Sequence, residues 1–179
     1  PLHVQPVTLS YGPSASDPRT LVFMANNDGY LHAIDAETGA ERWAFVPRRL
    51  LPQLYTLYRN EPAPQKVYGL DGEITLYLRN RDGQPGISDG DQAILLFGMG
   101  RGGRALFAVD VTDPDAPALL WEIDSGTPGF ADIGQTWSRP VVTRVGVAGR
   151  SGSDEVVIVG GGHDPGQDNR DYRTDTIGN

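Results

Sequence analysis

The 179-residue chain contains no cysteine. This absence excludes disulfides, cysteine-ligated zinc, iron–sulfur clusters and thiol nucleophiles. Cationic residues are also scarce, with 15 Lys and Arg against 23 Asp and Glu and a formal net charge of −8. An acidic chain repels phosphate backbones, so general nucleic-acid binding is not expected. No uninterrupted apolar run approaches the roughly 20 residues needed to cross a bilayer, so no transmembrane segment is expected in this chain.

The chain also lacks a recognisable catalytic constellation. Its three histidines, His3, His32 and His163, are dispersed, and no serine lies in a nucleophile elbow. We therefore expect no enzymatic activity. The chain starts at Pro1 and stops in polar sequence at Asn179, which predicts a segment of a longer protein with any export signal outside it.

Turn-forming residues, in contrast, are abundant. Glycine supplies 23 residues and proline 14, well above their usual joint share of about 12% of a chain. This composition favours short strands joined by turns over a helical bundle.

An internal repeat organises these strands. Leu31–Asp35 aligns position by position with Leu106–Asp110 at an offset of 75 residues, and Trp43 aligns with Trp121 at an offset of 78. Each copy has an apolar run, a glycine-containing turn, an alternating run that ends in Asp, a polar turn and a run with Trp. This order predicts three consecutive antiparallel strands in each copy.

The apolar runs upstream of the alternating runs and the carboxylates in the turns also recur between the two copies. Upstream, Leu21–Phe23 matches Leu95–Phe97 at an offset of 74 residues. We interpret Asp28, Asp35 and Asp110 as carboxylates that fix turns by accepting backbone N–H groups.

A further outer strand is expected in front of each trio. It would be Val4–Leu9 in the first copy and either Lys66–Leu70 or Ile74–Leu78 in the second. A third copy begins with Pro140–Val145 and Glu155–Val159 and is cut off before its Asp and Trp.

Four-stranded repeats of this kind are typical of β-propeller blades. The sequence predicts an all-β fold, a partial β-propeller of about two and a half four-stranded antiparallel blades of a larger ring, with one short helical insertion. Leucines at positions 50, 51, 54 and 57 give the insertion its helical spacing. The expected parts are a blade at about 2–46, the helical insertion at 47–60, a blade at about 65–123 with a polar loop at 79–92, and an incomplete blade at about 133–179.

Several motifs resemble known propellers. Asn27–Gly39, followed by Trp43, is similar to the blade motif of quinoprotein-type propellers. A longer series of motifs is more specific, and from about Leu21 to Asn179 it resembles the C-terminal propeller of the PilC/PilY family, the tip-associated proteins of type IV pili. The series consists of the Pro47–Leu57 helix, Phe97–Gly103, Ala108–Pro114 with Leu120–Glu122, Gly134–Pro140, and Gly160–Pro165 with Gln167–Asn169.

The resemblance implies a function. A protein of this family would be exported by a Gram-negative bacterium and lie at the cell surface, the pilus tip or the outer membrane. Its partners would be type IV pilus components such as minor pilins, together with a host or surface adhesion target. It would support pilus assembly, adhesion and twitching motility under the control of calcium. The calcium loop of the family lies in a later blade, outside this chain.

The polar loop offers its own candidate metal site. Asn80, Asp82, Asp89 and Asp91, with Gln84 between them, place oxygen ligands at alternate positions of one insertion. Calcium takes six to eight oxygens, which a tight loop can supply from alternate residues. An ordinary solvated loop is the favoured interpretation of these residues, and a calcium site, with calcium as the cofactor, is the alternative.

Two other motifs could suggest ligand sites but have simpler structural interpretations. His163 and Asp164, with Asp168, Asn169 and Asp171, could hold a cation or a partner, but a self-capping turn is the favoured interpretation. The glycines of Gly98–Gly103 superficially resemble a nucleotide loop. A phosphate cradle needs a following helix, whereas Arg104–Val111 alternates as a strand, so a hairpin connection is expected.

The tryptophans Trp43, Trp121 and Trp137 are interpreted as packing residues. Together these observations favour a non-enzymatic binding and assembly module. Two alternatives share the blade motif: a quinone-cofactor (PQQ-type) dehydrogenase propeller and a periplasmic scaffold for the assembly of outer-membrane proteins.

Overall fold

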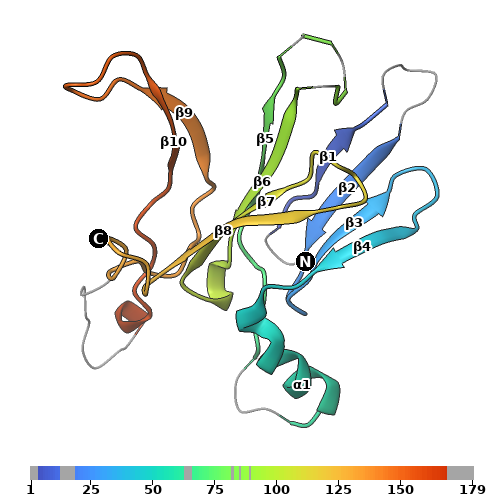
Figure 1. Ribbon diagram of the computed structural model, residues 1–179. Coiled ribbons are helices and arrows are strands. Elements are labelled where there is room, and N and C mark those ends of the chain that lie inside the picture. The colour runs from blue at the N-terminus through green and yellow to red at the C-terminus, as the bar shows by residue number, and fades with distance from the viewer. Residues whose placement is uncertain are drawn as a thin grey trace.

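The computed structural model describes residues 4–12, 19–62, 66–81, 83–84, 86–88 and 90–168. In these ranges the chain is all-β apart from one short α-helix, and it forms three separate antiparallel sheets side by side (Figure 1). Sheet 1 has the order β1-β2-β3-β4, sheet 2 has the order β5-β6-β7-β8, and β9 and β10 form a hairpin. The two complete sheets thus have the strand number and sequential order that the repeat predicts.

Sheet 1 consists of β1 (Val7–Ser10), β2 (Thr20–Ala25), β3 (Leu31–Asp35) and β4 (Glu41–Phe45). Asn26 fixes the β2–β3 turn, because its Oδ1 accepts the N–H groups of Asp28 at 3.1 Å and Tyr30 at 3.3 Å. The turn-fixing role expected for Asp28 therefore belongs to Asn26. Asp35 has the expected role, since its Oδ1 accepts the N–H of Thr38 at 2.9 Å.

Sheet 2 consists of β5 (Ile74–Arg79), β6 (Gln92–Gly98), β7 (Ala105–Asp110) and β8 (Ala118–Asp124). The separate hairpin consists of β9 (Val141–Val145) and β10 (Asp154–Ile158). The first strand of sheet 2 is therefore the second of the two expected segments, and Lys66–Leu70 is not a strand. Between β6 and β7 the glycine-rich segment forms the 3-10 turn η2 (Gly100–Gly102). A strand follows this turn, as expected for a hairpin connection.

The pairing of the third strand with the fourth strand identifies equivalent residues in the two sheets. The register with the fourth strand shifts between Ala33 and Ile34 in sheet 1 and between Ala108 and Val109 in sheet 2. Ala33 pairs with Trp43, and Ala108 pairs with Trp121. The two sheets therefore share a bulge at the same position, and the repeat predicted from these strands is confirmed.

The repeat alignment of the second strands is wrong by one residue. Phe23 pairs with Ala33, whereas the partner of Ala108 is Leu96 and not Phe97. A shift of one residue moves every side chain of a strand to the other face. Phe97 accordingly belongs to the core shared with sheet 1, and Leu96 lies on the face toward the β9–β10 hairpin.

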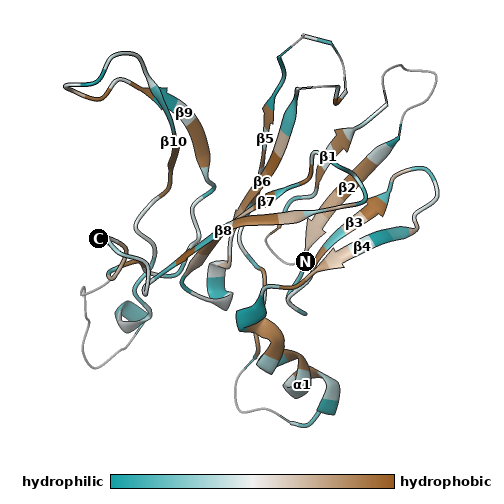
Figure 2. Ribbon diagram, viewed as in Figure 1, coloured by the Kyte–Doolittle hydropathy of each residue, from teal (hydrophilic) through white to brown (hydrophobic). Residues whose placement is uncertain are grey.

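A single apolar core joins sheets 1 and 2 (Figure 2). Phe23 contributes from β2, and Phe97 stacks on Phe107 with 5.3 Å between ring centroids. Trp43 packs against this core with its ring 5.8 Å from that of Phe23. The opposite face of sheet 2, which includes Trp121, lies against the hairpin. The middle strands of sheet 2, β6 and β7, are thus covered on both faces.

The helix projects from one end of the sheets (Figure 1). A short 3-10 segment, η1 (Arg48–Leu50), leads into α1 (Leu51–Arg59), which ends at Asn60 in the left-handed conformation with a φ of 48°. Leu50 is buried, but no residue of α1 itself is buried. The short helix predicted within 47–60 is present, and it is attached to the sheets mainly through the turn that precedes it.

At the α1 end, a series of backbone hydrogen bonds joins the segments that connect the strands of the three sheets. The N–H of Leu70 donates to the carbonyl of Asn26 at 3.0 Å, and the N–H of Asp71 donates to the carbonyl of Met99 at 3.2 Å. Gln135 and His163 then exchange two backbone hydrogen bonds at 2.8 and 2.9 Å. We call this series the backbone line.

Two features of the backbone line depend on specific residues. A Cβ added to Gly102 would overlap the carbonyl oxygen of Gly69, so the crossing requires glycine. Thr136 is buried, and its Oγ1 accepts the N–H of Met99 and donates to the carbonyl of Ala105, both at 2.8 Å. One hydroxyl therefore satisfies two buried backbone groups of sheet 2 and its connections.

Replacing this hydroxyl should destabilise the fold. Thr136→Val keeps the side-chain volume but leaves the Met99 N–H and the Ala105 carbonyl without this partner, at an expected cost of about 1–3 kcal/mol. Urea unfolding measures the loss. Thr136→Ser, which retains the hydroxyl, is the matched control and should be less destabilised. Equal losses in the two variants would show that the hydrogen bonds are not the cause.

Candidate functional site

The polar loop between β5 and β6 lies at the end of sheet 2 opposite α1 (Figure 1). Of the four predicted metal ligands, Asn80 and Asp91 are described, whereas Asp82 and Asp89 lie outside the described residues. Asn80 Oδ1 accepts the N–H of Gly83 at 2.6 Å. Asp91 closes the loop from its other end, near the start of β6.

Asp91 holds the loop in shape through its carboxylate. Its Oδ1 accepts the N–H of Arg81 at 2.7 Å, and its Oδ2 accepts the N–H and the hydroxyl of Ser88, each at 3.0 Å. These backbone hydrogen bonds keep the pKa of Asp91 below its ordinary value. Because both oxygens already serve the loop, Asp91 would reach a cation only through its remaining lone pairs.

The described residues bring no metal-like cluster together. Among them, no three Asp, Glu or His side chains converge as they would around an ion. His163 Nε2 lies 3.5 Å from the Asp168 carboxylate, and Asp164 accepts the N–H of Gly166 at 2.8 Å. The second acidic segment thus has the self-capping turn that was favoured, while Asn169 and Asp171 lie outside the described ranges.

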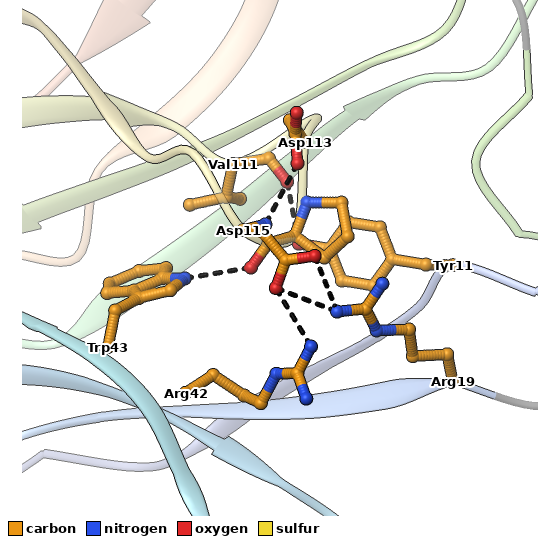
Figure 3. A network of polar contacts seen from close by, with 8 residues as sticks. Tyr11, Arg19, Arg42, Trp43, Val111, Asp113 and Asp115 are labelled. Atoms are coloured by element: carbon orange, nitrogen blue, oxygen red, sulfur yellow. Dashed lines mark hydrogen bonds and ion pairs between the residues drawn. The ribbon is translucent and has the colours of Figure 1, made fainter.

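The most extensive polar cluster joins sheet 1 to the β7–β8 connection of sheet 2 (Figure 3). Both carboxylate oxygens of Asp115 accept hydrogen bonds from Arg19 at 2.7 Å, and Arg42 donates to the same group at 2.9 Å. Trp43 Nε1 donates to the carbonyl of Pro114 at 2.9 Å, and the Tyr11 hydroxyl donates to the carbonyl of Val111 at 2.6 Å. These four side chains of sheet 1 hold one turn of sheet 2.

The environment of this cluster shifts two pKa values. Hydrogen bonds from Arg19, and then from Arg42, lower the pKa of Asp115. Burial raises the pKa of the Tyr11 hydroxyl above its ordinary value, so it remains a donor at all physiological pH values. Both shifts favour the observed pairing, in which Asp115 is ionised and the Tyr11 hydroxyl is protonated.

The sequence did not reveal this cluster. Arg19 and Arg42 lie 96 and 73 residues from Asp115. No local motif marks such a pairing. Only Trp43 carried a signal, because its place in the repeat predicted a packing role.

Acid should weaken the Asp115 cluster. The folded pKa of Asp115 lies below the unfolded value of about 3.9, so its stabilising contribution is present above that value and is lost as pH falls through the folded pKa. Asp115→Asn should therefore be less stable than the wild type at neutral pH, and this difference should narrow below about pH 4. Urea unfolding across pH provides the measurement. Asp132→Asn, an exposed carboxylate outside the cluster, is the control and should leave the profile unchanged.

Comparisons with known proteins place the chain in a family. It is 39% identical over 127 residues to a type IV pilus biogenesis factor PilY1 homologue of Xylella fastidiosa, and 37% identical over 129 residues to the type IV pilus biogenesis factor PilY1 of Pseudomonas aeruginosa strain UCBPP-PA14. Each match covers 69% of this chain. The chain spans only 9% and 10% of the length of these relatives. No family model matches the chain.

The fold gives the same result. The crystal structure of the Pseudomonas aeruginosa PilY1 C-terminal domain is similar with a TM-score of 0.55 and 28% identity, over 80% of this chain and 25% of that one. In the described part of the chain, no helix is both long and apolar enough to cross a membrane. By sequence and by structure, the resemblance inferred from the motifs is confirmed, and the chain belongs to the PilC/PilY family of type IV pilus biogenesis proteins.

Proposed function

We propose that the chain is part of a non-enzymatic β-propeller module that supports type IV pilus assembly, adhesion and twitching motility. The observation that carries this proposal is the 39% identity to a type IV pilus biogenesis factor. The fold supports it, because two sequential four-stranded sheets with the same bulge are the repeated unit of a propeller.

In this proposal, sheet 1 and sheet 2 are consecutive blades and the β9–β10 hairpin begins a third. The exposed apolar side chains support a larger ring. Val141 and Ile158 of the hairpin are 54% and 52% exposed, and Leu119 of β8 is 47% exposed. Further blades and their connections, supplied by the longer protein, would cover such surfaces.

A propeller of this kind would work by binding and not by chemistry. Rigid sheets position loops, and loops carry recognition. We place the protein outside the cytoplasm of a Gram-negative bacterium, at the cell surface, the pilus tip or the outer membrane. Its partners would be pilus components such as minor pilins, together with a host or surface adhesion target.

Gene deletion tests the assembly role. Loss of the full-length protein should abolish or strongly reduce surface pili and twitching zones, and expression of the wild-type gene should restore both. Electron microscopy and a subsurface motility assay give the readouts. The control is the level of outer-membrane β-barrel proteins, which should stay normal. Normal piliation with depleted barrels would instead indicate a scaffold for outer-membrane assembly, and a bound quinone seen by absorbance would indicate a dehydrogenase.

We further propose that the module binds calcium, with Asn80, Asp82, Asp89 and Asp91 as a site in this segment. The support is the alternation of oxygen ligands in one loop, of which Asn80 and Asp91 are held at its two ends. Calcium would bind the carboxylate lone pairs that the internal hydrogen bonds leave available.

Calorimetric calcium titration of the full-length protein tests this site. Because two anionic ligands are lost, the double variant Asp82→Ala/Asp89→Ala should remove one binding event or weaken it by about tenfold or more. Asp113→Ala/Asp132→Ala removes the same charge elsewhere and is the matched control. An unchanged titration for the loop variant would place the calcium ligands outside this loop.

A further inference from the structure

An open cavity of about 610 Å³ lies between the end of β5 and the β9–β10 hairpin. Sheet 2 lines it with Tyr77, Arg79 and Arg81, and the hairpin lines it with Arg144 and Glu155. Small-molecule sites usually have volumes of about 300–1,000 Å³. The cavity therefore has room for a ligand with several functional groups and is not limited to a single ion.

The lining of this cavity is basic, although the chain as a whole is acidic. Three arginines face it with one glutamate. Glu155 forms ion pairs with Arg79 and, at 3.6 Å, with Arg144. Since one carboxylate balances one guanidinium, the described lining keeps an excess of two positive charges in a chain whose formal net charge is −8.

Glu155 and Arg79 are the less exposed charged residues of the cavity. The Tyr77 side chain hydrogen-bonds with both Arg79 and Glu155, and the hydrogen bonds from Tyr77 and Arg79 keep the pKa of Glu155 below its ordinary value. Glu155 therefore stays ionised at neutral pH and holds Arg79 in place across the two sheets. This arrangement joins the two walls and leaves their outer arginines for a ligand.

Arg81 and Arg144 are the two outer arginines, one on each wall. The side chain of Arg144 is 68% exposed, and Arg81 is also exposed. Asp91 attracts Arg81 electrostatically, but its two oxygens are engaged by backbone and hydroxyl donors of the loop. Both guanidinium groups can thus offer N–H donors to a ligand.

Guanidinium groups bind carboxylates and phosphates through two parallel hydrogen bonds. We propose that this cavity binds a ligand with at least two closely spaced oxyanionic groups, with Arg81 and Arg144 each contacting one group. Arg79 is a positioning residue held by Glu155. The proposal does not depend on the pilus function or on the calcium site.

Two probes distinguish the possible sources of the oxyanion. Citrate presents carboxylates and pyrophosphate presents phosphates, and acetate is the single-charge comparison. Titration calorimetry of the full-length protein, in low salt after calcium has been removed by passage over a chelating resin, should show binding of at least one multivalent probe. Acetate should bind at least about tenfold more weakly, because it can engage only one arginine.

The variants assign the binding to residues. Arg81→Gln/Arg144→Gln should weaken the bound probe by at least about tenfold, since both direct contacts are lost. Both positions are exposed, so the fold should persist, and circular dichroism checks this. Arg150→Gln, in the same hairpin but outside the cavity and paired with Asp154 at 2.9 Å, is the single-charge control.

Three results would overturn the proposal. The first is no binding of either multivalent probe at millimolar concentration. The second is wild-type affinity in the Arg81→Gln/Arg144→Gln variant. The third is an equal loss in Arg81→Gln, Arg144→Gln and Arg150→Gln measured singly, because that pattern would reflect net charge and not this cavity.

Discussion

The packing of sheet 2 between two neighbours is the constraint on which the rest of the structure depends. One face of this sheet shares a core with sheet 1 through Phe97 and Phe107, and the other face meets the β9–β10 hairpin through Leu96 and Trp121. A sheet that is covered on both faces must be apolar on both faces. This explains why β7 is buried from Ala105 to Val109, and why both the polar cluster at Asp115 and the basic cavity lie at boundaries between sheets.

The same constraint separates what could be predicted from what could not. Strand order followed from the repeat, because glycine, Asn and Asp turns delimit each strand and because Trp recurs at matching positions. The alignment of Leu95–Phe97 failed by one residue because every side chain in that run is buried or nearly so, and no alternation marks which face is which. In β2 the burial alternates in the structure, but its sequence is likewise an apolar run after Thr20, so the faces of this strand are not marked in the sequence either.

The functional surfaces show a similar division. A cluster of oxygen ligands within one loop is visible in the sequence, and it suggested the cation site at Asn80, Asp82, Asp89 and Asp91. The basic cavity is assembled from Arg79 and Arg81 on one segment and from Arg144 and Glu155 far along the chain. Each of these residues by itself is an ordinary surface charge, so their meeting depends on how the second and third sheets pack. Folding thus places a basic cavity beside a polar loop in which the sequence showed a candidate cation site.

The backbone line at the α1 end has a consequence for the shape of the whole protein. Where Gly102 crosses Gly69, main chain meets main chain with no side chain between them, and the hydrogen bonds on either side fix that approach. The angle between successive sheets is then set by the dimensions of the peptide unit itself, and the repacking of side chains can alter it little. In a circular assembly, that angle determines how many units complete one turn. If the longer protein closes the proposed ring, exchange of either glycine for a larger residue would push successive sheets apart at this point and oppose closure.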